Sequence, residues 1–356
     1  MRPLMITSNQ QFSGKSSICI GLGKLLEEKD YKIGYMKTLI TLPEKVGDKY
    51  IDEDVRYITK ILDLKDDPGD LSPLIFTGQA YFNALKEQLK GEKKNYIDTI
   101  IKAYKRVAKN KDIMLVECAK KMEYGLFAGV SAREICKIIN GRAIIVMKYY
   151  DDIIDYAIYY KEFFQDCFGG IIINFVPQES MDKLKKVIIP YFEKNSINIF
   201  GAIPADKVLS SVSIKEMAAH LKGKILCAGD KTDELVESFM VGAMGHELAM
   251  RFFRTKTDKV VITGGDRADI QLAALETNTK CIILTGNFQP STVVTGRAEE
   301  LGVPMILVKD DTLTTVSRLN EIMGRSGLHE PKKLDKIMQI TRESIDIEKM
   351  VTLSGN

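Results

Sequence analysis

The chain has 356 residues, of which 45% are hydrophobic, so it is long enough for two or three domains with substantial cores. Its formal net charge of +3 is small for this length and gives no argument for nucleic acid or membrane partners. We also expect no membrane span and no signal peptide. Six cysteines lack Cys-x-x-Cys spacing and lie mostly in apolar stretches, which favours a cytoplasmic location, and three scattered histidines do not suggest a metal site.

The first motif in the chain predicts a phosphate-binding loop. Residues 3–7 are typical of a short buried strand, and apolar residues recur at helical spacing from Ile18 to Leu26. Between them lies the polar loop 8–17, which contains Ser13, Gly14, Lys15, Ser16 and Ser17. In this arrangement backbone N–H groups cradle a phosphate, the lysine supplies a point charge, and the hydroxyl that follows it faces a magnesium ion.

The loop departs from the usual pattern at Asn9, which stands where a glycine is expected. Asparagine tolerates left-handed backbone better than most residues, so we expect the turn to survive. The alternative is a loop rich in Ser and Asn that merely caps a helix. The flanking strand and helix favour a phosphate site.

Strands and helices then alternate up to about residue 205. We expect strands at 32–36, 113–116, 143–147, 170–173 and 197–203, with helices at 55–62, 79–91, 95–109, from 131 onward, 153–164 and 181–194. Residues 63–72 and 125–130 predict loops. Fully apolar strands separated by helices indicate a parallel sheet covered on both faces.

Polar residues or proline follow several of these strands directly. They are Lys37, Glu117, Asn174 and Pro204. Ligands of parallel α/β sheets bind outside the carboxyl ends of the strands, and the phosphate loop lies at that same edge. The sequence therefore predicts one ligand site at this edge.

A second α/β unit is expected after a connection at 206–213. Ser213 and Glu216 have capping-box spacing. Strands are expected near 224–227, 260–262, 281–284 and 305–308, and helices near 233–253, 268–276, 290–301 and 313–323. The charged residues at 328–356 predict a loosely held C-terminal tail.

Several stretches together resemble a known pair of domains. Residues 1–205 resemble the dethiobiotin-synthetase-like P-loop domain, and residues 214–327 resemble the DRTGG domain. The resemblance rests on the stretches at 14–19, 34–37, 52–54, 116–117, 201–204, 241–244, 262–267 and 283–286. In this order the pair resembles the amino-terminal half of the long bacterial phosphate acetyltransferase and its stand-alone relatives. Because the acetyltransferase domain is not in this sequence, we do not expect the chain to make acetyl phosphate itself.

The resemblance also implies roles for the site residues. The loop from Ser13 to Ser17 would hold the phosphates of ATP or another NTP, and Asn174 would contact adenine, with Pro204 beside the nucleotide. Asp54 and Glu117 match the carboxylates that complete a magnesium shell with Ser16. Lys37 matches the synthetase lysine that holds the substrate and its transferred phosphoryl group. The alternatives are a helix cap for Asp54, with Asp52 as the ligand in its place, solvated strand ends for Lys37 and Glu117, and a turn start for Asn174.

One departure from the synthetases concerns their substrate site. Where they have a small, glycine-rich stretch after the strand-end glutamate, this chain has Cys118, Ala119, Lys120, Lys121 and Met122. This difference argues against the synthetase chemistry more than against nucleotide binding.

The second domain carries its own candidate effector site. Gly264, Gly265, Asp266 and Arg267 lie between a strand and a helix, and Thr285-Gly286 ends the next strand. The glycines permit a tight turn, the aspartate can cap the helix, and the arginine can present a guanidinium fork to an anion. The alternative is a well-capped turn with no ligand.

These observations favour a nucleotide-binding regulatory protein with ATP and magnesium as cofactors. We expect a small-molecule effector and a homo-oligomer. The competing hypotheses are a stand-alone ATP-dependent ligase, and a scaffold whose loop has lost nucleotide binding.

Overall fold

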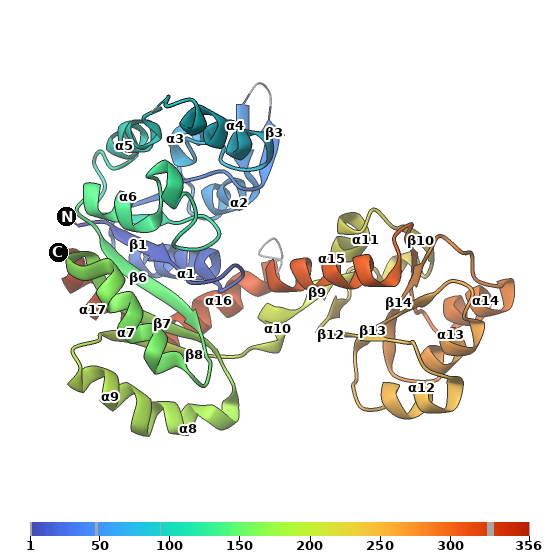
Figure 1. Ribbon diagram of the computed structural model, residues 1–356. Helices are drawn as coiled ribbons and strands as arrows, with labels where there is room; N and C mark the ends of the chain where they lie inside the picture. Colours follow the sequence, from blue (N-terminus) through green and yellow to red (C-terminus); the bar gives the residue numbers. More distant parts are fainter. Residues whose placement is uncertain (1, 47–48, 93, 326–330, 356) are drawn as a thin grey trace. The chain divides into compact units, whose positions relative to one another are not determined.

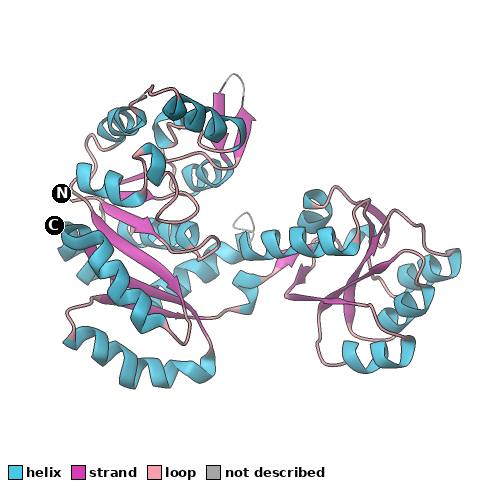
Figure 2. Ribbon diagram, in the orientation of Figure 1, coloured by secondary structure: helices cyan, strands magenta, loops and turns pink. Residues whose placement is uncertain are grey.

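The computed structural model describes residues 2–46, 49–92, 94–325 and 331–355. The chain divides into two compact units. The first contains Met1–Ala205 together with Leu328–Asn356, and the second contains Asp206–Gly327. Each unit has its own sheet flanked by helices (Figure 1; Figure 2). The chain thus leaves the first unit, forms the second, and returns to the first.

The sheet of the first unit is entirely parallel, as the apolar strands predicted. Its spatial order is β2 (Ile33–Lys37), β5 (Ile113–Glu117), β1 (Leu4–Thr7), β6 (Arg142–Lys148), β7 (Phe168–Val176) and β8 (Ile199–Pro204). Since β1 lies in the middle, the loop after it opens at the centre of the carboxyl edge. Lys37 pairs in register with Glu117, so these two strands end side by side.

Helices and short turns connect these strands. They are α1 (Lys15–Glu27), α2 (Glu53–Ile61), α3 (Pro68–Leu71), α4 (Gly78–Leu89), α5 (Tyr96–Val107), η1 (Leu126–Ala128), α6 (Ala132–Ile138), α7 (Ile153–Phe164), η2 (Gln165–Cys167), η3 (Gln178–Ser180), α8 (Met181–Lys183), η4 (Leu184–Ile188) and α9 (Ile189–Lys194). The sequence did not predict the hairpin formed by β3 (Pro43–Val46) and β4 (Lys49–Asp52). Its second strand runs directly into α2.

The end of the chain is not a loose tail in the residues described. It forms α16 (Pro331–Ser344) and α17 (Ile347–Ser354), and α16 packs along α1 (Figure 1). A Cβ on Gly21 of α1 would lie 2.1 Å from the Thr341 hydroxyl oxygen, so the glycine permits this close approach. The sequence prediction failed because charged residues dominate the composition of α16. One face of the helix is nevertheless apolar and includes the buried Ile337 and Ile340.

The second unit has a five-stranded sheet. The order is β10 (Lys224–Cys227), β15 (Met305–Leu307), β14 (Thr279–Thr285), β13 (Lys259–Gly264) and β12 (Ser238–Val241), with β10 antiparallel to its neighbour. A separate pair joins β9 (Val212–Ser213) to β11 (Leu235–Val236). The helices are α10 (Lys207–Ser210), α11 (Ile214–His220), α12 (His246–Phe253), α13 (Ala268–Leu275), α14 (Thr292–Glu300) and α15 (Thr312–Arg325), with a short turn η5 (Gly229–Lys231).

Two sequence predictions for this unit have different outcomes. The N-cap of the expected capping box is confirmed, because the Ser213 hydroxyl accepts a hydrogen bond from the Glu216 N–H at 3.3 Å. The prediction of a single helix at 233–253 is wrong. Residues 238–241 pair with β13 as an edge strand, and the helix begins only at His246. Gly242 follows the strand, and its N–H continues the pairing by donating to the Ile262 carbonyl.

Candidate functional site

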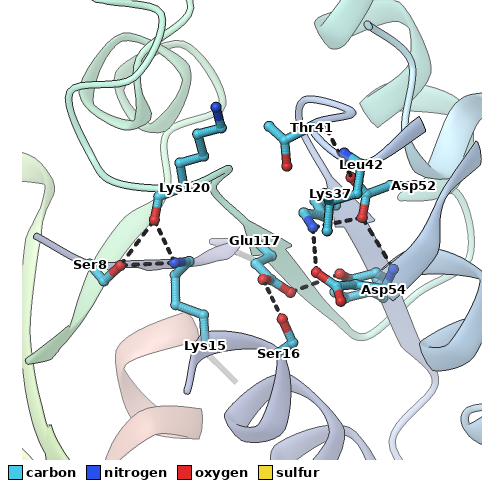
Figure 3. A network of polar contacts seen from close by, with 11 residues as sticks. Ser8, Lys15, Ser16, Lys37, Thr41, Leu42, Asp52, Asp54, Glu117 and Lys120 are labelled. Carbon is cyan, nitrogen blue, oxygen red and sulfur yellow. Dashed lines mark hydrogen bonds and ion pairs between the residues drawn. The ribbon is translucent and has the colours of Figure 1, made fainter. Parts of the chain in front are cut away.

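Lys15 is the first residue of α1 and is held in a buried position. Its ammonium donates to the Ser8 hydroxyl at 2.9 Å and to the Lys120 carbonyl at 2.8 Å (Figure 3). Both acceptors are uncharged, and only 7% of the residue is exposed. A cation therefore sits at the positive end of a helix, where an anion is stabilised by both.

The conformation of the loop corrects one expectation. The residues of the described loop with left-handed backbone are Phe12 (φ 56°) and Gly14 (φ 91°), not Asn9. Gly14 is needed for a second reason, since a Cβ there would lie 2.4 Å from the Asn174 side-chain nitrogen. That nitrogen donates to the Ser13 carbonyl at 2.9 Å, so Asn174 braces the loop from β7.

Two polar atoms of the loop are buried without a hydrogen-bond partner among the described residues. They are the side-chain oxygens Oδ1 of Asn9 and Oγ of Ser13. Leaving such atoms unsatisfied costs about 1–3 kcal/mol each. A polar ligand in the loop would relieve that cost, and this supports a binding role.

Glu117 lies beside the start of α1. Its Oε1 accepts from the Ser16 hydroxyl at 2.8 Å (Figure 3). Its Oε2 accepts from the Tyr35 hydroxyl at 2.8 Å. Burial is the main cause that raises the pKa of Glu117, and the ammonium groups of Lys37 and Lys15 oppose the increase. The carboxylate is thus held at both oxygens by residues from two different elements.

Lys37 forms the second half of the polar cluster. Its ammonium lies 2.7 Å from Asp52 Oδ1 and 2.6 Å from Asp54 Oδ2. Burial alone would lower the pKa of Lys37, but the carboxylates of Asp54 and Asp52 outweigh it, and the pKa is raised. The cap of α2 is Asp52, which accepts from the Asp54 N–H at 3.2 Å. The alternative that Asp54 is the N-cap of this helix is therefore wrong.

Asp52 also holds the chain that enters this region. Its Oδ2 accepts from the backbone N–H groups of Thr41 at 2.9 Å and Leu42 at 3.3 Å. With Lys37 and the α2 N-terminus, one fully buried carboxylate thus joins β2, the following loop and α2.

These residues fit a magnesium ion bound largely through phosphates. No group of three or more His, Cys, Asp or Glu side chains suited to a metal occurs in the part of the chain that the structure describes. Magnesium usually takes one or two carboxylates plus phosphate and water oxygens at about 2.0–2.1 Å, so adjacent ligand oxygens lie about 2.9 Å apart. The Ser16 hydroxyl oxygen and Glu117 Oε1, joined by a hydrogen bond of 2.8 Å, are close enough for one ion to contact both.

The remaining predicted residues occupy the same edge. Ser17 lies in the first turn of α1, and Asn174 and Pro204 lie at the carboxyl ends of the neighbouring strands β7 and β8. Sequence reasoning missed Tyr35 and the Lys120 carbonyl. Tyr35 and Lys37 are two residues apart on one strand and share a face of the sheet, which is the signal that could have found the tyrosine.

The turn in the second unit is built differently. A Cβ on Gly265 would lie 1.8 Å from the Phe288 carbonyl oxygen, so the glycine is required by close packing. Arg267 directs Nε and Nη2 to the Asp269 carboxylate, each at 3.0 Å, and Nη2 also donates to the Met244 carbonyl at 2.9 Å. The N-cap of α13 is Arg267 and not the expected Asp266.

Thr285 and Gly286 do lie beside this turn. Gly264 pairs in register with Thr285, and the Gly265 N–H donates to the Thr285 carbonyl at 3.3 Å. The Thr285 hydroxyl lies 2.9 Å from that of Thr312. The guanidinium fork and this hydroxyl therefore already have partners within the unit.

Comparison with known proteins agrees with the two-unit architecture. The AAA domain family matches residues 2–213, and the DRTGG domain family matches residues 216–322. A phosphate acetyltransferase of Synechocystis sp. is 24% identical and aligns with 98% of this chain and 51% of its own length. The phosphate acetyltransferase of Nitratidesulfovibrio vulgaris is 22% identical, over 96% of this chain and 50% of its own. The chain spans about half the length of the curated relatives it matches.

Solved structures show weaker similarity. The MinC:MinD cell division protein complex of Aquifex aeolicus is 18% identical, with a TM-score of 0.34 over 59% of this chain and 84% of that chain. The CBS and DRTGG domains of a Clostridium perfringens pyrophosphatase are 18% identical, with a TM-score of 0.29 over 40% of this chain and 69% of that chain. No described helix is long and apolar enough to cross a membrane. On the extent of the first family match, the chain belongs to the AAA domain family, and its P-loop domain is followed by a DRTGG domain.

Proposed function

We propose that the first unit binds ATP or another nucleoside triphosphate together with magnesium. The observation that carries the proposal is the convergence of Lys15, Ser16 and Glu117 at the carboxyl edge of a parallel sheet. The unpaired loop atoms add support, because the Ser13 hydroxyl would donate to a bound phosphate, and Oδ1 of Asn9 would accept from a water of the bound ligand. Asn174 and Pro204, at the ends of β7 and β8, are the proposed contacts of the nucleoside.

Each residue has a defined task in this proposal. Lys15 turns from Ser8 and the Lys120 carbonyl to the β- and γ-phosphates, and the N–H groups at the start of α1 bind the same anion. Magnesium, when bound, would neutralise phosphate charge. Ser16 and Glu117 would hold the ion. Asp54 belongs to the same polar cluster, because its carboxylate pairs with the Lys37 ammonium.

The finer proposal is a regulatory protein. We propose that the second unit senses a small-molecule effector at Gly264–Arg267 and Thr285-Gly286, that the chain assembles as a homo-oligomer, and that it works in the cytoplasm. The proposal draws on the phosphate acetyltransferase relatives, about half of whose length this chain spans. Acetyl transfer itself belongs to those proteins.

An ATP-dependent ligase is the competing function, and the geometry weighs against it. A ligase of the synthetase type needs Lys37 for its substrate. Here that ammonium is neutralised by Asp52 and Asp54 at 2.7 and 2.6 Å. Rapid ATP hydrolysis or ligation by the pure protein would favour the ligase over the regulatory function.

Calorimetry tests nucleotide binding directly. ATP, GTP and ADP are titrated into the wild type with and without magnesium, and into Lys15→Ala. Loss of one charge-assisted contact should cost about 1.5–3 kcal/mol, which is roughly one to two decades in affinity. The matched control is Lys24→Ala on the same helix, where the ammonium pairs with Glu27 at 2.9 Å. Equal ATP affinity in wild type and Lys15→Ala would refute the phosphate site.

A further inference from the structure

Tyr35 is one of the largest fully buried side chains of the first unit, and its only polar atom is committed to the site. No part of the residue is exposed, and its hydroxyl donates to Glu117 Oε2 at 2.8 Å. The two residues are 82 positions apart and come from the neighbouring strands β2 and β5. A phenylalanine would fill the same volume, so packing alone does not explain the hydroxyl.

The contact fixes which oxygen of Glu117 remains for other partners. With Oε2 occupied by Tyr35, Oε1 is the oxygen that meets the Ser16 hydroxyl at 2.8 Å. A carboxylate bonded at one oxygen only can rotate about its terminal bond. Holding both oxygens therefore sets the plane of the group before any ligand arrives.

We infer that Tyr35 is a positioning residue: it holds Glu117 so that Oε1 is directed to the Ser16 hydroxyl, where these two oxygens would hold a magnesium ion. The inference rests on the proposed function and specifies how the metal half of the site is organised. Outer partners of this kind orient ligating groups, and their removal typically lowers metal affinity about 10–100-fold.

The test measures metal binding apart from turnover. Mn²⁺ is titrated into the full chain in the presence of ATP and followed by electron paramagnetic resonance, for wild type and Tyr35→Phe. We expect Mn²⁺ affinity to fall about tenfold or more, while the affinity for ATP without metal stays within about twofold. Thermal melting verifies that each variant is folded. Tyr104→Phe is the control, a half-buried tyrosine on α5 that should leave both affinities unchanged.

A double-mutant cycle separates positioning from general stability. If Tyr35 acts through Glu117, then Glu117→Gln and the double variant Tyr35→Phe/Glu117→Gln should have the same Mn²⁺ affinity. Additive losses would contradict this route. A lower melting temperature with unchanged Mn²⁺ affinity would make Tyr35 a core residue only.

The outcomes also separate this inference from the function on which it rests. If the wild type binds no nucleotide, with or without metal, both the proposed function and the role of Tyr35 are contradicted. A wild type that binds ATP, together with a Tyr35→Phe variant whose Mn²⁺ affinity matches it, leaves nucleotide binding in place and overturns only the role of Tyr35.

Discussion

Among the side chains whose burial the structure describes, each unit has one buried lysine on a strand, and the pKa values of these two lysines shift in opposite directions. Lys37 on β2 is 4% exposed and lies between the carboxylates of Asp52 and Asp54 at 2.7 and 2.6 Å. Lys259 on β13 is 0% exposed, and its ammonium donates to the Asn278 carbonyl at 2.8 Å and the Thr277 hydroxyl at 3.2 Å. The pKa of Lys37 is raised, whereas burial lowers the pKa of Lys259 to about 8.

Both side chains are almost inaccessible to solvent, and the charge of their partners accounts for the opposite shifts in pKa. In the first unit Lys37 has charged partners, and the contacts of the same polar cluster join separate elements, as with Ser16 and Glu117, which are 101 positions apart. In the second unit the charged pair at the candidate site joins Arg267 to Asp269, only two positions away. The polar cluster of the first unit thus joins several elements at the carboxyl edge of its sheet, whereas the charged pair of the second unit is local.

The largest effect on stability is expected from removing the Asp52 carboxylate, which pairs with the Lys37 ammonium. Asp52→Ala leaves a buried ammonium with one carboxylate and removes the acceptor of three backbone N–H groups. Breaking a buried pair typically costs about 3–5 kcal/mol, and we expect a loss of this size in the free energy of unfolding. Urea denaturation followed by circular dichroism measures it.

Asp346→Ala is the matched control for that variant. Asp346 caps α17 by accepting from the Lys349 N–H at 2.9 Å, without the buried lysine. Loss of a helix cap should cost about 0.5–2 kcal/mol. Equal losses in both variants would mean that Lys37 contributes nothing beyond the cap, and the contrast between the two lysines would lose its energetic basis.

The parallel sheet and the polar residues at its carboxyl edge were predictable because both leave a local signature. Buried parallel strands are continuous apolar runs, so β1, β5, β6 and β7 were found and their polar end residues placed together. The AAA and DRTGG matches confirm the two domain families. The hairpin before α2 was missed, since Pro43 and the charged residues around it show no apolar alternation.

The details of the site were harder to predict, for reasons that are also physical. The Lys120 carbonyl that receives Lys15 is a backbone group, which residue identity does not encode. Arg267 has the chemistry of an anion receptor in the sequence, but Asp269 fills its guanidinium fork in the fold. Which partner a side chain selects depends on distances that only the tertiary structure sets.

A smaller effect should follow from changing the packed turn of the second unit. Gly265→Ala places a Cβ 1.8 Å from the Phe288 carbonyl oxygen, so the backbone of the turn must move. Overpacking of this kind typically costs about 1–3 kcal/mol. The matched control is Gly245→Ala, where nothing lies within 4 Å of the added atom. We expect thermal melting to separate the two variants, and equal melting temperatures would show that the turn yields freely.

The pH dependence of Lys259 sharpens the comparison of the two lysines. Its pKa is about 8 in the fold and about 10.4 in an unfolded chain, and Asp258 only partly offsets the burial that lowers it. Between these values the unfolded state binds more protons, so this residue's contribution to the unfolding free energy rises with pH across the window. Below pH 8 the penalty of burying the charge is present in full.

Lys259→Met removes that penalty. We expect its stability relative to the wild type to be most favourable below pH 8 and to become less favourable as the pH rises toward 10.4. Urea denaturation between pH 7 and 10.4 measures the gap, with Lys280→Met as control, because Lys280 lies 3.6 Å from both Glu234 and Asp258. A gap that does not change across the window would show that burial does not depress the pKa of Lys259.

The smallest effect on stability should come from Arg267→Ala. The pair with Asp269 is exposed, with 37% and 46% of the two side chains accessible, and such pairs contribute about 0–1 kcal/mol. A sensing role predicts something that stability does not report: the variant should shift the nucleotide titration of the first unit or change the mass of the assembly. Linkage requires that an effector bound at this turn and a nucleotide at the loop alter each other's affinity by the same factor. Light scattering and calorimetry on wild type and Arg267→Ala measure both quantities, and identical masses with identical titration curves would reduce Arg267 to the internal partner of Asp269.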